Sequence, residues 1–216
     1  MLKIPGKKPT QPTAPVATEP AADPSGLSDS WKSIISTIAI VLAAFILALI
    51  IKGYLIQPYV VDGQSMEPTL QNSDRLLVNK VPETFAHFEG HQYVPARGSI
   101  IVFNKSGLPG YVGTKQLIKR VIGLPGERVV VKDGKITIYN TAHPHGFNPD
   151  TTTGYTITAP LTQGALDQTL GPSQLFVCGD NRDNSEDSRF FGPIDTNDVV
   201  GKLAMRIMPL GHAERF

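Results

Sequence analysis

An uninterrupted apolar run near the N-terminus limits what this chain can fold into more than any other feature. Residues 34–51 read IISTIAIVLAAFILALII and contain no charged side chain. At ~1.5 Å per residue, a helix of this length is about 27 Å long, close to the ~30 Å hydrocarbon core of a bilayer. Trp31 and Tyr54 flank the run, where interfacial aromatic side chains are expected. The sequence therefore predicts a transmembrane anchor over residues 31–56.

Two alternatives compete with a retained anchor. The core helix of a soluble protein is disfavoured because the run has no polar face. A cleaved secretory signal is disfavoured because the run is long and begins some thirty residues into the chain. Residues 1–30 contain six prolines and lack the apolar density that ordering requires, which predicts a disordered tail.

The distribution of lysines predicts how the anchor is oriented. Four lysines precede the apolar run, whereas only Lys52 follows it closely. Positively charged flanks are retained on the cytoplasmic side of a membrane. The tail is therefore expected in the cytoplasm, and the domain that begins at residue 57 is expected on the extracytoplasmic side.

The part of the chain that follows the anchor suits one mainly β unit of roughly 160 residues. Twenty glycines, eighteen prolines and many β-branched residues are typical of a turn-rich β protein. The Asp133-Gly134 pair predicts a hairpin with a type I′ turn. Residues 141–172 show only weak periodicity, which indicates an inserted loop region or small subdomain. Strands are predicted within 75–81, 98–104, 117–123, 128–140 and 175–180.

Charge and metal-binding patterns narrow the function. The net charge is +1 and no block is rich in Lys or Arg, so no nucleic-acid partner is expected. Cys178 is the only cysteine, so no intramolecular disulfide can form. A calcium loop starting at Asp183 would have Ser188 where glycine is needed. The five histidines show no metal-binding motif, and neither a metal nor a cofactor is expected.

Two residues are candidates for nucleophilic chemistry. Ser65 lies in QSMEPTL, which lacks the second glycine of the G-x-S-x-G nucleophile elbow. In an extended strand Lys119 shares a face with Leu117 and Val121, and such apolar neighbours lower the pKa of a lysine. Taken alone, a serine in a turn is more often structural, and a lysine more often extends from a sheet edge into water. A Ser-His-Asp triad also remains open at this point.

The segment GDNRDNSEDSR, residues 179–189, is dense in charged and amide side chains. We expect a turn network in which its carboxylates pair with Arg182 and Arg189. Such a network either fixes loop geometry beside a site or stabilises the loop itself.

Five segments, in this order and behind one anchor, resemble bacterial type I signal peptidase: SMEPTL, RLLVNK, RGSIIVFN, KRVIGLPGE and GDNRDNSEDSR. The resemblance covers most of 57–127 and 174–192. It implies an antiparallel β catalytic domain, formed by 57–127 and 173–216, with a small β insertion at 128–172. It also implies a bacterial plasma membrane enzyme that cleaves signal peptides from exported preproteins after small residues, of the Ala-X-Ala type. Its partners would be these preproteins, the lipid bilayer and the protein export machinery.

The resemblance also assigns roles to residues at matching positions. Ser65 corresponds to the nucleophile and Lys119 to the general base of a serine–lysine dyad that works through an acyl-enzyme. Ser185 corresponds to a serine that hydrogen-bonds and orients the lysine, and Asp187 and Arg189 to an ion pair that shapes the site. The pockets for substrate residues −1 and −3 are expected to be lined by Met66, Leu70 and Ile118.

Three positions depart from the family pattern. Gly63 replaces a serine whose hydroxyl helps to stabilise the oxyanion, Leu117 replaces a tyrosine, and Glu127 replaces an aspartate. We therefore expect the backbone N–H of Ser65 to bind the oxyanion, with Gly63 letting the main chain approach the substrate.

Two other functions compete with this interpretation. A self-cleaving repressor would share the serine–lysine pair, but this chain shows no DNA-binding module and that function leaves the apolar run unexplained. A non-enzymatic, membrane-anchored β domain would have no need of both Ser65 and Lys119.

Overall fold

The computed structural model describes residues 26–50, 53, 55–152, 154–155, 157 and 161–216. Most of the predicted tail, residues 1–25, lies outside these ranges. The chain divides into two units, Met1–Ile46 and Leu47–Phe216.

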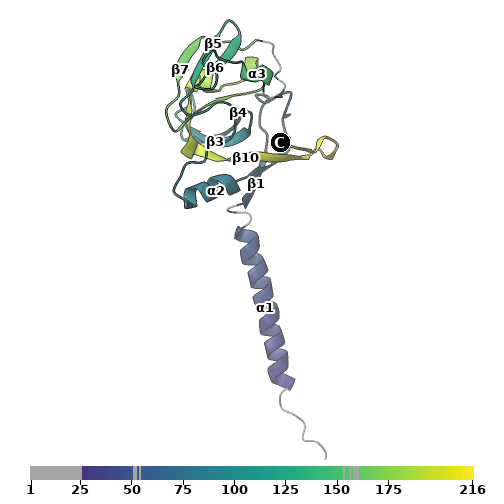
Figure 1. Ribbon diagram of the computed structural model, residues 1–216. Coiled ribbons are helices and arrows are strands. Elements are labelled where there is room, and N and C mark those ends of the chain that lie inside the picture. Colours follow the sequence, from purple (N-terminus) through teal and green to yellow (C-terminus); the bar gives the residue numbers. More distant parts are fainter. Residues whose placement is uncertain (1–25, 51–52, 54, 153, 156, 158–160) are drawn as a thin grey trace, which may run out of the picture. The chain divides into compact units, whose positions relative to one another are not determined.

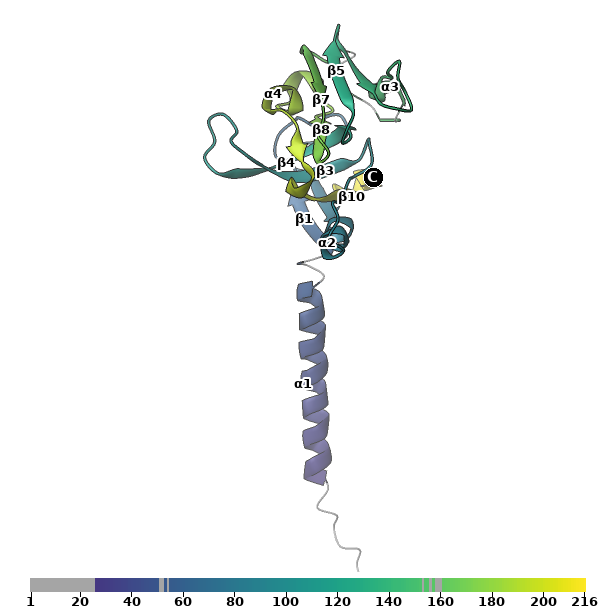
Figure 2. The ribbon, with the colours of Figure 1, turned by 60° about the vertical axis from the view of Figure 1, so that its left-hand side comes forward.

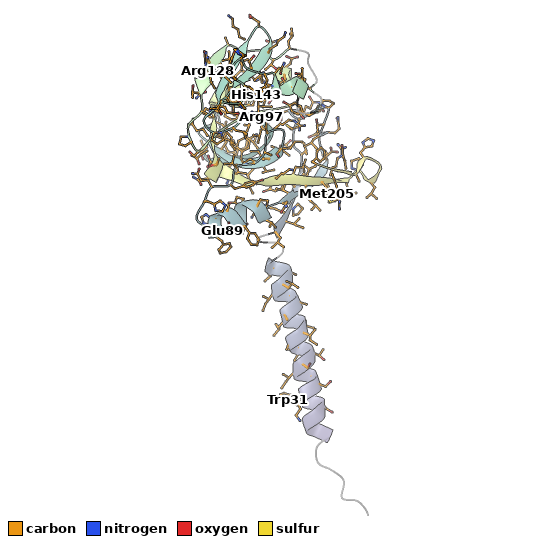
Figure 3. The ribbon with its side chains drawn as sticks, viewed as in Figure 1. Trp31, Glu89, Arg97, Arg128, His143 and Met205 are labelled. Carbon is orange, nitrogen blue, oxygen red and sulfur yellow. The ribbon has the colours of Figure 1, made fainter. Side chains whose placement is uncertain are left out.

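The helix α1, Gly26–Ile50, contains the apolar run identified in the sequence. Its segment Ser30–Leu49 is long and apolar enough to cross a membrane, and none of it is buried within the protein. Figure 3 shows Trp31 near the N-terminal end of α1, with other side chains extending outward along the helix. A helix without a polar face is what the sequence predicted for this segment.

The second unit is built from short strands and helices. Its strands are β1 (Ile56–Val60), β2 (Arg75–Asn79), β3 (Ile100–Ser106), β4 (Thr114–Gly123), β5 (Arg128–Lys132), β6 (Lys135–Tyr139), β7 (Leu166–Thr169), β8 (Gln174–Cys178), β9 (Ile194–Asp195), β10 (Val199–Met208) and β11 (Glu214–Arg215). Its helices are α2 (Val81–Phe88), α3 (Pro149–Thr152) and α4 (Ser188–Phe191), with 3-10 helices η2 (Arg182–Asn184), η3 (Thr196–Asp198) and η4 (Leu210–His212).

Eight strands form the main sheet, in the order β1-β2-β10-β3-β4-β8-β9, with β11 paired to β10. The paired strands are antiparallel. Figure 1 shows this sheet with β3, β4 and β10 near one another, and Figure 2 shows the hairpin between β3 and β4 projecting from it. The strand β4 lies between β3 and β8 in the sheet, and its second half is buried in the domain from Arg120 to Gly123.

A smaller sheet of β6, β5 and β7 follows β4 in the chain. Its hairpin pairs Lys132 with Lys135, and both Asp133 and Gly134 have positive φ, at 51° and 72°. Positive φ at both central residues defines the type I′ turn, so the predicted turn is confirmed. One face of this sheet packs into a hydrophobic cluster that includes Val129, Ile138 and Phe176.

The predicted fold class is confirmed, and each predicted strand range overlaps a strand of the structure. Several elements were not predicted, and β10 and α2 are the longest of them. The strand β10 has register shifts at three places, which break the alternation of side chains on which strand prediction relies. The predicted strand 75–81 ends at Asn79, because α2 begins at Val81 with a proline in its first turn. The side chain of Asn79 accepts a hydrogen bond from the Val81 N–H at 2.9 Å.

Candidate active site

Ser65 lies in a turn that follows β1 and is held in place from two sides. The side chains of Met66 and Leu70 are 1% and 0% exposed and belong to a core cluster with Ile100 and Leu203. The backbone of Ser65 is fixed from the opposite segment, because its carbonyl accepts a hydrogen bond from the Asn181 N–H at 3.1 Å. The apolar residues of SMEPTL therefore anchor the turn, and the serine hydroxyl is presented at its surface.

Lys119 reaches this hydroxyl from β4. Its Nζ donates a hydrogen bond to Ser65 Oγ at 2.7 Å, although 54 residues separate the two in the chain. The strand pairs Lys119 with Ile101 of β3, and the lysine is only 3% exposed. Leu117 packs in the same cluster as Val121, as expected from alternation, so Lys119 lies between two apolar side chains on its strand.

Burial lowers the pKa of Lys119 from 10.5 to about 8. Removal of water disfavours the ammonium and is the largest cause; the Asp187 carboxylate acts in the opposite direction by stabilising the charge. A lysine with this pKa is about one-tenth neutral at pH 7, whereas an ordinary lysine is almost wholly protonated. The arrangement can therefore supply a proton acceptor beside a hydroxyl.

We expect Lys119→Met to stabilise the folded protein at pH 7. Because the pKa of Lys119 is 10.5 in the unfolded chain and about 8 in the folded protein, the folded state binds the proton less tightly. Below pH 8, where both states are protonated, this lowers the free energy of unfolding by about 3 kcal/mol. That cost disappears as pH rises from 8 to 10.5, because the unfolded lysine then loses its proton as well. Urea unfolding of both proteins in detergent should give the variant the higher free energy of unfolding at pH 7. The difference between the two proteins should shrink as the pH rises above 8. A gap independent of pH would contradict a depressed lysine pKa.

The segment 179–189 folds against the turn that contains Ser65, residues 65–69, which we call the serine turn. Gly179 packs so closely that an added Cβ would lie 2.3 Å from both the Ser65 carbonyl oxygen and Ser185 Oγ. The Asp187 carboxylate accepts the Gly179 N–H at 3.0 Å and pairs with Arg189 at 2.8 Å. The expected pairing of Arg189 within this loop is therefore present, whereas the partner of Arg182 comes from outside it, from Asp150 of α3.

Ser185 lies beside Ser65 and Lys119 without a hydrogen bond to either. It lines the same hollow as Ser65 and Lys119, and its side chain is buried. Within the part of the chain that the structure describes, its hydroxyl has no hydrogen-bond partner. The expected hydrogen bond from Ser185 to Lys119 is thus not formed in this structure, where the lysine donates to Ser65 instead.

Two hollows meet at Ser65 and Lys119. The first has a volume of about 150 Å³, and its apolar wall includes Leu76, Val102 and Ile118. The second is bordered by the turn at Gly63 and by the loop at Ser185. Of the three residues expected to line substrate pockets, Ile118 contributes to the first hollow. Met66 and Leu70 belong to the core and are not among the described residues that border either hollow.

Comparison with known proteins places this site in a family. Residues 34–208 match the family model described as signal peptidase, peptidase S26. The chain belongs to this family. It is 32% identical over 190 residues to signal peptidase IB of Staphylococcus aureus (strain COL), and the matched residues cover 82% of this chain and 91% of the relative. It is 33% identical over 189 residues to the probable signal peptidase I-1 of Synechocystis sp., covering 86% of this chain and 88% of the relative.

A solved structure was also matched. The crystal structure of a signal peptidase I from Enterococcus faecalis V583 is 28% identical, with a TM-score of 0.37, and covers 51% of this chain and 97% of that one. The family relationship itself rests on the sequence matches, which extend from the apolar helix to β10.

The backbone N–H groups of Gly63 and Ser65 differ in whether they already have a hydrogen-bond acceptor. The backbone of Gly63 has φ of 101°, a conformation that strains any other residue. Its N–H is already used, since it donates to Asn72 Oδ1 at 2.9 Å. The N–H of Ser65, by contrast, makes no hydrogen bond to another described residue.

The other departure with a visible consequence is Glu127. It is buried and pairs with Arg97 at 2.5 Å, and it also accepts the Leu124 N–H at 2.8 Å. These contacts hold the turn after β4, and the hydrogen bond from Arg97 together with that from Asn140 lowers the pKa of Glu127 against the opposing effect of its burial. Glu127 therefore stabilises the turn after β4.

Sequence reasoning missed a second buried ion pair, which lies next to Lys119. Arg120, next to Lys119 on β4, forms a bidentate pair with Asp180 at 2.8 and 2.5 Å, and Asp180 accepts a hydrogen bond from Thr69 at 2.6 Å. The signal was present, because alternation placed Arg120 on an apolar face with Ile118, and a cation there requires an acidic partner. The segment 179–189, which is rich in carboxylates, could have supplied that partner.

Proposed function

We propose that this protein is a membrane-bound serine endopeptidase that cleaves signal peptides from exported preproteins, with Ser65 as nucleophile and Lys119 as general base. Membership of the signal peptidase family supports the reaction class. The observation that carries the residue assignment is the 2.7 Å contact between Ser65 Oγ and the Nζ of a lysine that is 3% exposed. Buried amines of this kind accept protons near neutral pH.

The proposed reaction is acyl transfer in two stages. Neutral Lys119 takes the proton of Ser65 as its Oγ attacks the scissile carbonyl, and the protonated amine then donates to the departing amino group. The resulting acyl-enzyme is hydrolysed by a water molecule that Lys119 deprotonates in turn. The N–H of Ser65, which has no hydrogen-bond partner among the described residues, is the oxyanion donor that this proposal uses.

The loop residues are proposed to support the dyad. Asp187, held by Arg189, fixes Gly179 against the serine turn and supplies a negative charge that partly offsets the desolvation of Lys119. Ser185 has a hydroxyl without a partner in the hollow beside Lys119, so it is placed to bond the amine once Ser65 turns toward substrate. No metal or cofactor takes part in this mechanism.

We propose that the first hollow receives the small residues at −1 and −3 of the signal peptide. Its volume of about 150 Å³ suits alanine-sized side chains, and Ile118 forms part of its wall. Met66 and Leu70 would support this wall from the core behind it. A small pocket whose wall is held in place by the core rejects larger side chains by overlap.

A synthetic preprotein in detergent tests both the activity and this specificity. We expect release of the mature protein when Ala occupies −1, and at least hundredfold slower cleavage with Leu at −1. Ile118→Ala should raise cleavage of the Leu substrate at least tenfold, because it removes part of the wall. Ile136→Ala is the matched control, because Ile136 is buried in the core of the smaller sheet and is not among the described residues that border either hollow. It should lower stability by about 2–5 kcal/mol without changing the preference. Efficient cleavage after Leu by the unmodified protein would contradict the proposal.

The orientation follows from the lysine distribution. We propose that residues 1–30 lie in the cytoplasm and that the β domain lies on the opposite side, with export machinery and membrane-inserted preproteins as its partners. Protease added to spheroplasts should digest the β domain and leave the proline-rich tail intact. A protected β domain would reverse the assignment.

A further inference from the structure

The buried carboxylate of Asp150 lies outside the serine turn and the segment 179–189, but it pairs with Arg182 of that segment. Asp150 of α3 accepts two hydrogen bonds from Arg182, at 2.6 and 2.5 Å, and the side chains of Arg182 and Asp150 are 0% and 8% exposed. Thr162, from the same weakly patterned stretch, accepts a further bond from Arg182 at 2.6 Å. The guanidinium is therefore fixed by residues of 141–172.

Arg182 passes this constraint to the serine turn. Its Nε donates to the Gly179 carbonyl at 3.0 Å, while the Gly179 N–H is held by Asp187. Gly179 packs directly against the Ser65 carbonyl oxygen, and its neighbour Asn181 donates to that oxygen. A shift of Arg182 would therefore move the surface on which Ser65 rests.

A second route leaves Asp150 in another direction. The hydroxyl of Tyr155 donates to Asp150 at 2.7 Å, and the guanidinium of Arg120 lies 4.3 Å from the centre of the Tyr155 ring. Arg120 pairs with Asp180, which accepts from Thr69 in the serine turn. Both ends of that turn, at Ser65 and at Thr69, are thus connected to one carboxylate.

We propose that Asp150 is a positioning residue for the peptidase reaction, which acts through Arg182 and Tyr155 to hold the serine turn against Lys119. This rests on the proposed role of Ser65. Asp150 is not among the described residues that border either hollow, so it has no contact through which to alter substrate affinity. Its effect falls on the distance and angle between nucleophile and base, to which rates are steeply sensitive.

Asp150→Asn tests the proposal in the full-length protein, assayed with the synthetic preprotein at a temperature where circular dichroism shows it folded. We expect kcat to fall by about 10- to 100-fold with KM unchanged, because geometry and not binding is altered. Asp150→Glu, which keeps the charge, should recover part of kcat. A folded Asp150→Asn protein with kcat within twofold of the original would overturn the inference.

Two carboxylates provide matched controls. Glu127→Gln breaks the buried pair with Arg97, whose contacts lie at the turn after β4 and not at the serine turn. Asp167→Asn breaks an exposed pair with Arg128 on the smaller sheet. Figure 3 labels both arginines. Each control should keep kcat within about twofold; an equal loss in Glu127→Gln would show that any buried-pair defect lowers the rate, and would refute a specific role for Asp150.

A double variant keeps the test decisive if Asp150→Asn does not fold. Asp150→Asn combined with Arg182→Met removes the unpaired buried cation, and neutral replacements of buried ion pairs are commonly tolerated. It still lacks the bond to Gly179, so we expect normal stability with low kcat; normal kcat would overturn the inference. Ser65→Ala in the same assay separates the two proposals: if it stays active, the proposed nucleophile is wrong whatever Asp150 does.

Discussion

Ser65→Ala should leave the protein folded and reduce cleavage of a preprotein by about 10⁶-fold, the size of loss found when a serine protease loses its nucleophile. The substitution removes one oxygen from a half-buried side chain whose hydroxyl accepts a hydrogen bond from Lys119. Met66 and Leu70 still anchor the turn in the core, so the fold is not expected to change. Single-turnover release of mature protein from a synthetic preprotein measures the loss.

The control for this prediction is Ser106→Ala, which removes an exposed hydroxyl at the end of β3. Its activity should equal that of the unmodified protein. A chromatographically pure Ser65→Ala protein with ordinary activity would mean that another residue attacks the substrate.

Lys119→Arg should be as inactive as Lys119→Ala. An arginine stays protonated at any accessible pH, so it can donate to Ser65 but cannot accept its proton. Its larger planar head group also replaces a compact amine at a buried position. Lys135→Arg, at an exposed site beside the hairpin turn, is the matched control and should be fully active. An active Lys119→Arg enzyme would exclude lysine as the base.

The pH profile of the unmodified enzyme provides a second measurement of the same group. Because only neutral Lys119 acts as a base, kcat/KM should fall tenfold per pH unit below the pKa of about 8 and level off above it. The direction is fixed: acid inactivates by protonating the amine. An acid limb near pH 10 would show that the lysine is not desolvated in the working enzyme.

Local patterns allowed much of the fold to be predicted, because they depend on neighbouring residues alone. The apolar run predicted α1, and Asp133-Gly134 predicted the type I′ turn. Strand β10 was missed because its bulges interrupt alternation, although it pairs with both β2 and β3 near the centre of the sheet. Helix α2 was missed because its short apolar pattern follows a strand without a break.

The candidate site, like the fold, could be predicted from the sequence only in part. Family resemblance in the sequence pointed to Ser65, Lys119 and the segment 179–189, but gave no sign of Asp150, which lies where periodicity is weak. Nothing in the spacing of Arg182 distinguishes a partner within its own loop from one 32 residues earlier. Hydrogen bonds between distant segments leave no local pattern, so only the folded chain reveals them.

By itself, the sequence predicted an apolar helix and a mainly β domain, and its resemblance to a family pointed to Ser65 and Lys119. The tertiary structure decided that Ser65 and Lys119 meet at 2.7 Å, and that the lysine is buried deeply enough for its pKa to fall to about 8. The physical reason is that desolvation depends on every segment that surrounds an amine. For Lys119 these are the neighbouring strands, the serine turn and the 179–189 loop, which come together only when the whole domain folds.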